Sequence, residues 1–431
     1  MMIYLHSLGC DKNLVDSEIM LGLLYESGCK IEADPSQADV IVINTCGFIR
    51  EAVEEGIETV LEFAGYKKEG RCSFLIVTGC MAQRYKNDIM AEIPEVDAIL
   101  GVNDFPKIAD IINRRPTNSI DVLDDQLFQK RINTMPMHVT YIKISEGCDN
   151  RCTYCTIPDI RGPYRDRKFE SITAECERMV KNGSKELVLV AQDTAKYGTN
   201  LYGRQRLHEL LESIANLDDL GWVRVMYAYP EHIYPDLINV IASHEKICSY
   251  LDMPIQHSDQ AVLARMGRKI FTLNELISQL KGKGIAIRTT LIAGFPGETE
   301  EEYENLRSFV EASEFNHLGV FAYSREEGTP AAGMKPQIKT SVKKNRVNEL
   351  MTLQAKIAEK NNKTLVDRTL KVMVDGSIED GGGRIYSGRS QKDAYEIDGS
   401  VFFSSDMEWM SGDFVDVKIT KAHGYDLYGT L

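Results

Sequence analysis

The chain has 431 residues, and its 64 acidic and 50 basic residues give a formal net charge of −14. This length allows two or three domains. The excess of acidic residues argues against binding of a nucleic acid backbone through an extended basic surface. No apolar run is long enough to cross a membrane, and the first residues lack the features of a signal peptide. We therefore expect a cytoplasmic protein without a membrane partner, whose ten cysteines stay reduced.

The first part of the chain predicts an α/β domain with a parallel sheet, which we assign to residues 1–130. Apolar runs at 3–8, 40–44 and 74–78 predict buried strands, and residues 16–27 have the periodicity of a helix. Strands that alternate with helices in this way are typical of a sheet whose strands run parallel.

Cys10, Cys46 and Cys80 each follow one of these strands and stand next to a glycine. The carboxyl ends of parallel strands meet at one edge of a sheet, where ligands bind. A single such cysteine would be interpreted as an ordinary buried thiol. Because the same context occurs three times, we interpret these thiols as ligands of one iron–sulfur cluster. The four cysteines without this context are expected in the core or on the surface: Cys29, Cys72, Cys176 and Cys248.

A second α/β stretch, which we assign to residues 135–364, predicts a partial or full (β/α) TIM-like barrel. Functional residues of such barrels lie at the carboxyl ends of the strands. Residues 340–363 are polar, basic and helix-prone, and predict a linker helix. The six predicted strands are 139–144, 187–191, 223–227, 250–253, 287–292 and 318–323.

The spacing C-x3-C-x2-C of Cys148, Cys152 and Cys155 is the most specific motif of the chain. Three thiolates can hold three corners of a [4Fe–4S] cluster and leave the fourth iron open, and in radical chemistry that iron binds S-adenosylmethionine. A structural zinc site would need a fourth Cys or His at matching spacing, which is absent. A disulfide framework is not expected in a long chain without a secretory signal. We therefore predict that the three cysteines are catalytic and ligate a cluster.

Further residues near the predicted barrel mouth are candidates for cofactor binding. Gly294 and Gly297 would let the backbone approach a flat ligand such as an adenine ring, and Glu298 either contacts this ligand or starts a helix. Tyr154, inside the cysteine motif, either flanks the cofactor or packs in the core. Gln192 ends another strand and is expected to contact cofactor or substrate, although a lone glutamine in a loop is more often structural.

Residues 365–431 predict a small β-barrel. They contain seven Lys and Arg against twelve Asp and Glu. A barrel that binds RNA would be expected to carry a basic face, whereas an acidic barrel suits a basic protein partner. The predicted strands are 369–374, 384–388, 399–403 and 413–419, with a turn at 380–383.

Taken together, these motifs make the chain similar to the radical S-adenosylmethionine methylthiotransferases over essentially its whole length. The resemblance implies two [4Fe–4S] clusters and S-adenosylmethionine as cofactors, and a C-terminal TRAM-like barrel. It also implies that Cys10, Cys46 and Cys80 bind an auxiliary cluster that carries or supplies sulfur. The residues that carry the resemblance are 9–13, 44–47, 79–80, 148–155 and 294–298.

Residues 9–18, 157–165 and 393–399 resemble the branch of this family that methylthiolates the β-carbon of an aspartate in small-subunit ribosomal protein twelve. Tyr395 departs from the proline that is frequent there. The resemblance implies the ribosomal protein or the 30S subunit as substrate. It also implies a low-potential electron donor of the flavodoxin or ferredoxin type and a sulfur donor as partners. The alternatives are methylthiolation of a tRNA adenosine with the same clusters, and a non-catalytic iron–sulfur electron carrier or cluster-bound RNA-binding module, which would not need the 294–298 motif.

The resemblance also implies the reaction. One electron on the cluster of Cys148, Cys152 and Cys155 cleaves S-adenosylmethionine to a 5′-deoxyadenosyl radical, which removes a hydrogen from the aspartate β-carbon. The resulting carbon radical takes a methylated sulfur from the auxiliary cluster, and a second S-adenosylmethionine donates the methyl group.

Overall fold

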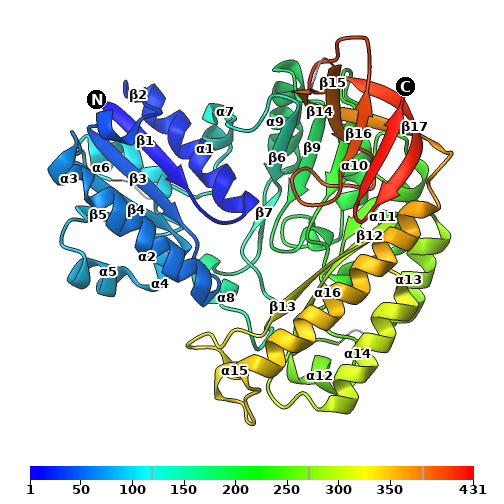
Figure 1. Ribbon diagram of the computed structural model, residues 1–431. Helices are drawn as coiled ribbons and strands as arrows, with labels where there is room; N and C mark the ends of the chain where they lie inside the picture. Colours follow the sequence, from blue (N-terminus) through cyan, green and yellow to red (C-terminus); the bar gives the residue numbers. More distant parts are fainter. Residues whose placement is uncertain (118–119, 270–271, 381–382) are drawn as a thin grey trace.

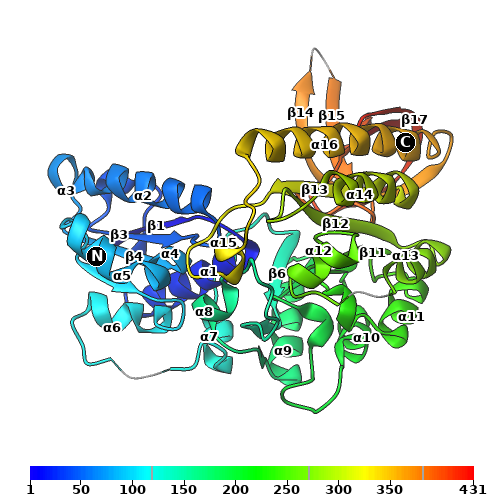
Figure 2. The ribbon, with the colours of Figure 1, turned by 90° about the horizontal axis from the view of Figure 1, so that it is seen from below.

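The computed structural model describes residues 1–117, 120–269, 272–380 and 383–431. Figure 1 shows three parts in chain order, an N-terminal α/β part, a central part of strands and helices, and a C-terminal barrel. The N-terminal part lies beside the central part in both ribbon views (Figures 1 and 2).

The N-terminal part is a five-stranded parallel sheet with the strand order β2-β1-β3-β4-β5. Its central strand is buried along its whole length, and successive side chains enter two different cores. Val42 packs with Val15 on one face, and Ile41 packs with Val60 on the other. The strands are β1 (Met2–Ser7), β2 (Lys30–Ile31), β3 (Val40–Thr45), β4 (Phe74–Gly79) and β5 (Ala98–Leu100).

Helices cover both faces of this sheet. The first helix begins at Asp11, five residues before the predicted start, because Asp11, Lys12 and Asn13 form a polar first turn without apolar periodicity. Cys10 is therefore the residue that caps this helix. The helices are α1 (Asp11–Glu26), α2 (Arg50–Ala64), α3 (Tyr66–Glu69), α4 (Cys80–Arg84), α5 (Lys86–Glu92), α6 (Ile108–Ile112) and α7 (Asp125–Lys130).

The central part is a partial barrel of six parallel strands. Two three-stranded sheets, ordered β10-β9-β6 and β11-β12-β13, are linked by a bridge between Val223 and Ile247. The end strands are β6 and β13, and no strand pairing among the described residues joins them. The strands are β6 (Val139–Lys143), β9 (Glu186–Val190), β10 (Trp222–Val225), β11 (Tyr250–Asp252), β12 (Ala286–Ala293) and β13 (His317–Ala322), with a short pair β7 (Ser145–Glu146) and β8 (Arg165–Asp166) after the first strand.

The helix α16 (Thr340–Lys363) has the predicted bounds, but it is part of the central core and does more than link two domains. Leu350 and Gln354 are fully buried, and the Gln354 amide donates to the Phe315 carbonyl at 2.9 Å. The other helices of this part are α8 (Ile157–Arg161), α9 (Phe169–Lys181), α10 (Leu207–Ala215), α11 (Pro235–Ser243), α12 (Gln260–Arg265), α13 (Leu273–Gly282), α14 (Glu300–Ser313) and α15 (Pro330–Gly333).

The C-terminal part is a closed five-stranded barrel with the order β14-β15-β16-β18-β17. Four strands were predicted, and the fifth was missed because β18 has no run of buried apolar residues. The predicted turn at 380–383 lies partly outside the described residues. The strands are β14 (Thr369–Asp380), β15 (Gly383–Arg389), β16 (Val401–Ser404), β17 (Phe414–His423) and β18 (Asp426–Thr430).

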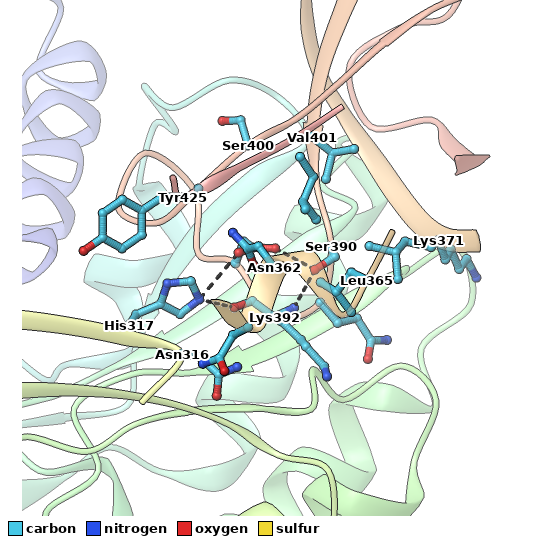
Figure 3. A pocket seen from close by; sticks show the side chains of 16 residues that line it. Asn316, His317, Asn362, Leu365, Lys371, Ser390, Lys392, Ser400, Val401 and Tyr425 are labelled. Carbon is cyan, nitrogen blue, oxygen red and sulfur yellow. Dashed lines mark hydrogen bonds and ion pairs between the residues drawn. The ribbon is translucent and has the colours of Figure 1, made fainter. Parts of the chain in front are cut away.

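The barrel is attached to the central part by buried ion pairs. Glu186 of β9 pairs with Arg224 of β10 at 2.7 Å and with Arg389 of the barrel. A cavity of about 210 Å³ lies at the same junction, and Figure 3 shows side chains that line it. On its wall, His317 Nε2 lies 2.8 Å from the Lys392 carbonyl oxygen, which only accepts, so Nε2 carries the proton. Polar contacts thus seat the barrel on the central part.

No helix among the described residues is both long and apolar enough to cross a membrane.

Candidate functional site

The structure brings Cys10, Cys46 and Cys80 to the carboxyl edge of the N-terminal sheet. Cys10 caps α1, Cys46 directly follows β3, and Cys80 is the first residue of α4. Two glycines with positive φ permit this approach. A Cβ on Gly9 (φ +94°) would lie 2.9 Å from the Cys46 Cβ, and a Cβ on Gly79 (φ +94°) would lie 2.4 Å from the Thr45 oxygen. We name these three cysteines the N-terminal triad.

Asn13 of α1 orders the N-terminal triad. Its Nδ2 donates to the carbonyls of Leu8 and Thr45, each at 3.1 Å. Its Oδ1 accepts from Arg161 at 2.5 Å and lies 3.7 Å from the Cys80 sulfur. One amide therefore fixes the loops before α1 and after β3 and also contacts the third cysteine.

Cys148, Cys152 and Cys155 lie in the loop between β7 and α8, past the end of the first barrel strand, and we name them the barrel triad. The loop is held by backbone hydrogen bonds from Cys148 N to Gly162 O and from Cys155 N to Cys152 O, each at 3.1 Å. The Cys152 sulfur lies 3.2 Å from the Tyr229 hydroxyl. This anchoring orders the motif before any ligand binds.

Burial raises the pKa of four of the triad thiols, Cys46, Cys80, Cys148 and Cys155. It raises the pKa of Cys148 to about 11 and that of Cys155 to about 12. Burial also raises the pKa of Cys80 to about 12, although the nearby Arg161 guanidinium opposes this shift. These four thiols would stay protonated when free, so a ligand that binds thiolates would release protons from them and replace the lost hydration.

The thiols of each triad are a chemically suitable donor set for an iron–sulfur cluster. All six cysteines are free, and soft thiolates are the ligands that [4Fe–4S] clusters take. No group of three or more His, Cys, Asp or Glu side chains among the described residues is placed to hold a single metal ion. Three thiols match three irons of a cluster and would leave its fourth iron open.

A buried network of four charges lies between the two triads. Arg161 of α8 pairs with Glu146 at 3.0 Å and with Asp16 of α1 at 3.2 Å. Lys143 of β6 pairs with the same two carboxylates at 2.8 and 2.5 Å. Burial alone would raise the pKa of Glu146, but Arg161 and Lys143 hold it well below its usual range. The group is electrically neutral overall, and we name it the inter-triad quartet.

Gln192, a predicted cofactor or substrate contact, lies against this quartet. Its Nε2 donates to Glu146 at 3.1 Å, whereas its buried Oε1 has no partner among the described residues. A buried amide oxygen without a donor is costly, so this atom is available to a ligand that carries a hydrogen-bond donor.

Tyr154 lies against the turn that follows β12. Its ring contacts Phe295 edge-on, with centroids 6.5 Å apart. Arg268 stacks on the neighbouring Tyr229 ring at 3.8 Å and donates two hydrogen bonds to the Glu231 carboxylate, each at 3.0 Å. Aromatic faces and a fixed cation thus border the barrel triad.

The 294–298 motif forms a tight turn whose glutamate is already engaged. The Glu298 carboxylate accepts from the Gly294 and Phe295 amides at 3.0 and 3.1 Å, and from Arg346 of α16 at 2.6 Å. Gly294 has φ +74°, and a Cβ there would lie 2.4 Å from the Lys343 side chain. Direct contacts of Gly294, Gly297 and Glu298 with a cofactor stay predictions, while Glu298 holds the turn in place.

Further polar residues lie around the barrel triad. Asp193, in the strand end 191–194 that was expected near the barrel mouth, is fully buried and accepts from Asn150 at 3.1 Å, and its Oδ2 lies 2.6 Å from His232 Nδ1. Arg161 and Glu146 were missed as site residues. Their proximity in sequence to the cysteine motif was the available signal.

Three family descriptions match successive parts of the chain. Residues 2–101 match the uncharacterized protein family UPF0004, residues 142–310 the radical SAM superfamily, and residues 366–431 the TRAM domain. The ribosomal protein uS12 methylthiotransferase RimO of Lachnoclostridium phytofermentans is 49% identical and covers 100% of both chains. The chain belongs to the RimO family. The RimO of Acetivibrio thermocellus is 46% identical over 99% of this chain and 97% of its own.

Solved structures show the same fold at low identity. The radical S-adenosylmethionine methyltransferase TsrM from Kitasatospora setae, with cobalamin and a [4Fe–4S] cluster bound, matches with a TM-score of 0.56 and 15% identity over 77% of this chain and 76% of TsrM. The cobalamin-dependent S-adenosylmethionine radical enzyme OxsB matches with a TM-score of 0.52 and 11% identity over 82% of this chain and 56% of OxsB. As a RimO-family radical SAM protein, the chain is a methylthiotransferase that uses an iron–sulfur cluster and S-adenosylmethionine.

Proposed function

We propose that this RimO-family enzyme adds a methylthio group to the β-carbon of an aspartate in ribosomal protein uS12, with one [4Fe–4S] cluster on each cysteine triad. The observation that carries the proposal is the arrangement of two thiol triads on either side of one buried charged network. Asn13, beside the N-terminal triad, and Arg161, beside the barrel triad, contact each other directly. This contact supports a common function of the two triads over two independent metal sites.

The chemistry of the bound groups and the work of the protein are separate. When bound, the barrel-triad cluster with S-adenosylmethionine supplies a carbon radical, and the N-terminal cluster supplies sulfur. The protein orients both groups through Asn13 and the inter-triad quartet and offers the free Gln192 oxygen to a donor on cofactor or substrate. It also places the barrel-triad loop among the side chains of Tyr154, Tyr229 and Phe295, which limits the access of water.

The partners follow from the same chemistry. The radical step consumes an electron, so we propose a low-potential flavodoxin or ferredoxin as donor, and a separate sulfur donor restores the auxiliary site. We propose that the enzyme acts in the cytoplasm, where it meets free uS12 or the 30S subunit. We also propose domains at 1–130, 135–364 and 365–431, supported by the start of β6 at Val139 and the end of α16 at Lys363.

The proposed function is tested by anaerobic incubation of the reconstituted enzyme with S-adenosylmethionine, dithionite and either uS12 or tRNA, followed by mass spectrometry. We expect a methylthio mass gain on a peptide of uS12 that contains an aspartate. A gain on a tRNA adenosine instead would contradict the proposed substrate.

The proposal for two clusters makes a separate prediction for Cys46→Ser. This variant should lose about half of the bound iron and all methylthiolation, because only the N-terminal triad is broken. It should still cleave S-adenosylmethionine to 5′-deoxyadenosine, which chromatography measures. Full methylthiolation by Cys46→Ser would show that the N-terminal triad holds no essential cluster.

A further inference from the structure

A groove of about 560 Å³ lies between α2, α5 and the segment 325–327 that follows β13. Its floor is apolar and includes Val53, Met81 and Ile89. Ile57 and Leu61 of α2 also line it and are 39% and 54% exposed. Large aliphatic side chains gathered at one exposed groove mark a surface that another molecule covers.

The rim of this groove carries free negative charge. Asp88, Glu92 and Glu327 line it, and none of them makes an ion pair with another described residue. Only one other acidic residue of the rim, Glu54, is exposed, and it is paired with Arg50 at 2.8 Å. One cation, Arg325, also lines the groove; it makes no ion pair with a described residue and donates to the Ala332 carbonyl at 2.8 Å. The groove therefore combines an apolar floor with three unpaired carboxylates and one unpaired cation, which leaves a net excess of two negative charges.

The walls of the groove are fixed to each other across two parts of the molecule. The buried Glu326 accepts from the Arg50 amide at 2.9 Å and from the Arg84 guanidinium at 3.2 Å. Arg84 also donates to the Gly47 carbonyl at 2.6 Å, directly after Cys46. In Figures 1 and 2 the segment that carries α15 leads from β13 toward the N-terminal part. The groove is thus preformed and adjoins the N-terminal triad.

We propose that this groove, defined by α2, α5 and residues 325–327, docks a basic segment of the protein substrate. The inference rests on the proposed function and adds the surface that recognises the substrate. A ribosomal protein binds RNA phosphates and therefore carries many Lys and Arg side chains. Such a segment supplies the cations that Asp88, Glu92 and Glu327 lack, while its apolar side chains cover Ile57 and Leu61. An acidic partner would be repelled by the same rim.

The test is equilibrium binding of fluorescently labelled uS12 to the anaerobically reconstituted holoenzyme. In Asp88→Lys/Glu92→Lys, we expect Kd to rise about five- to tenfold at low salt, because two attractive contacts become repulsive. This difference should shrink as salt increases, since rim charges are screened. Leu61→Ser should weaken binding about threefold with little dependence on salt, because it removes apolar contact.

The matched control is Glu55→Lys/Glu62→Lys, which makes the same charge change at exposed positions of α2 that do not line the groove. Its Kd should stay within about twofold of the wild type. Equal Kd values for the groove variant and the control would overturn the proposal, as would a wild-type enzyme that does not bind uS12. The product assay with dithionite is scored separately, so tight binding without methylthiolation would refute the proposed function and leave the docking surface standing.

Discussion

At the scale of single residues, Arg161 is the side chain that contacts residues next to both triads. It contacts Asn13 on the N-terminal side and Glu146 on the barrel side, and it is 1% exposed. A buried cation next to cysteine ligands favours the more negative, reduced state of a bound cluster. Arg161 is therefore a positioning residue that also adjusts the electrostatics of the N-terminal site.

Replacement of Arg161 tests this role. Arg161→Met leaves Asp16 and Glu146 with Lys143 alone, and should lower the free energy of unfolding by about 3–5 kcal/mol. It should also lower the reduction potential of the cluster that we propose on the N-terminal triad, measured by an anaerobic redox titration with electron paramagnetic resonance. Arg161→Lys keeps the charge and should stay closer to the wild-type potential. An unchanged potential in Arg161→Met would limit Arg161 to a structural role.

The site residues that the sequence predicted are recognised by their local spacing, whereas the residues that it missed depend on contacts between distant parts of the chain. Cysteines at short spacing, or beside glycines at strand ends, predict a metal site from the local sequence pattern alone. Asp16 looks like a surface charge in the sequence because its partners, Lys143 and Arg161, lie 127 and 145 residues further along the chain. The free oxygen of Gln192 likewise depends on where Glu146 lies. Contacts of this kind follow from tertiary packing and have no sequence signature.

At the scale of elements, buried apolar runs predicted strands well and polar elements poorly. Residues 40–44 correspond to β3, which is buried throughout. The first turn of α1 was missed because its polar side chains serve the site: Asn13 contacts Cys80 and Asp11 accepts from the Tyr227 hydroxyl at 2.8 Å. The short β18 was missed because its strand character comes from pairing with β16 and β17.

The Glu298 carboxylate holds the turn after β12 through its hydrogen bonds. We therefore expect the stability of the protein to depend on pH. Burial raises the pKa of Glu298, but His257, the Gly294 amide and Arg346 together bring it below its ordinary value. A lowered pKa in the folded state adds stability at pH values above about 4.5, and this stability is lost as the pH falls through the folded pKa.

Glu298→Gln should therefore be less stable than the wild type by about 1–3 kcal/mol at pH 7. The gap should narrow as the pH falls below about 4.5, where the unfolded carboxylate takes up its proton, and should close as the pH falls through the lower pKa of the folded state. Urea unfolding at pH 7, 5, 4 and 3 measures this difference. A gap that does not change with pH would show that the charge of Glu298 contributes nothing to the turn.

At the scale of the whole molecule, buried ion pairs join the three parts. Glu186, Arg224 and Arg389 join the central part to the barrel, and Arg389 also pairs with Asp375 at 3.1 Å. His138, in turn, lies 2.9 Å from Asp375. The order of the three parts along the chain was predictable from composition, but these contacts between parts were not.

Removal of Arg389 tests how firmly the barrel is seated. Arg389→Met removes the one guanidinium that pairs with both Glu186 and Asp375. The barrel should therefore dissociate more readily from the central part. We expect a loss of about 2–4 kcal/mol in the free energy of unfolding and faster proteolysis between α16 and β14. Lys418→Met, at an exposed position of β17 that does not line the junction cavity, serves as the control. Equal proteolysis of both variants would contradict this role.

The helix α1 carries a further consequence for the evolution of the enzyme. Besides Asp16 in the inter-triad quartet, its Glu18 pairs at 2.5 Å with Arg131, which in turn pairs with Glu175 of α9 at 2.9 Å. Arg167 also pairs with Glu175. In each network the N-terminal part therefore supplies one negative charge and the later residues supply one net positive charge, so neither half is neutral alone. A chimera that joins the N-terminal part of one relative to the barrel of another should fold stably only if Asp16, Glu18 and their partners in the two networks were inherited together.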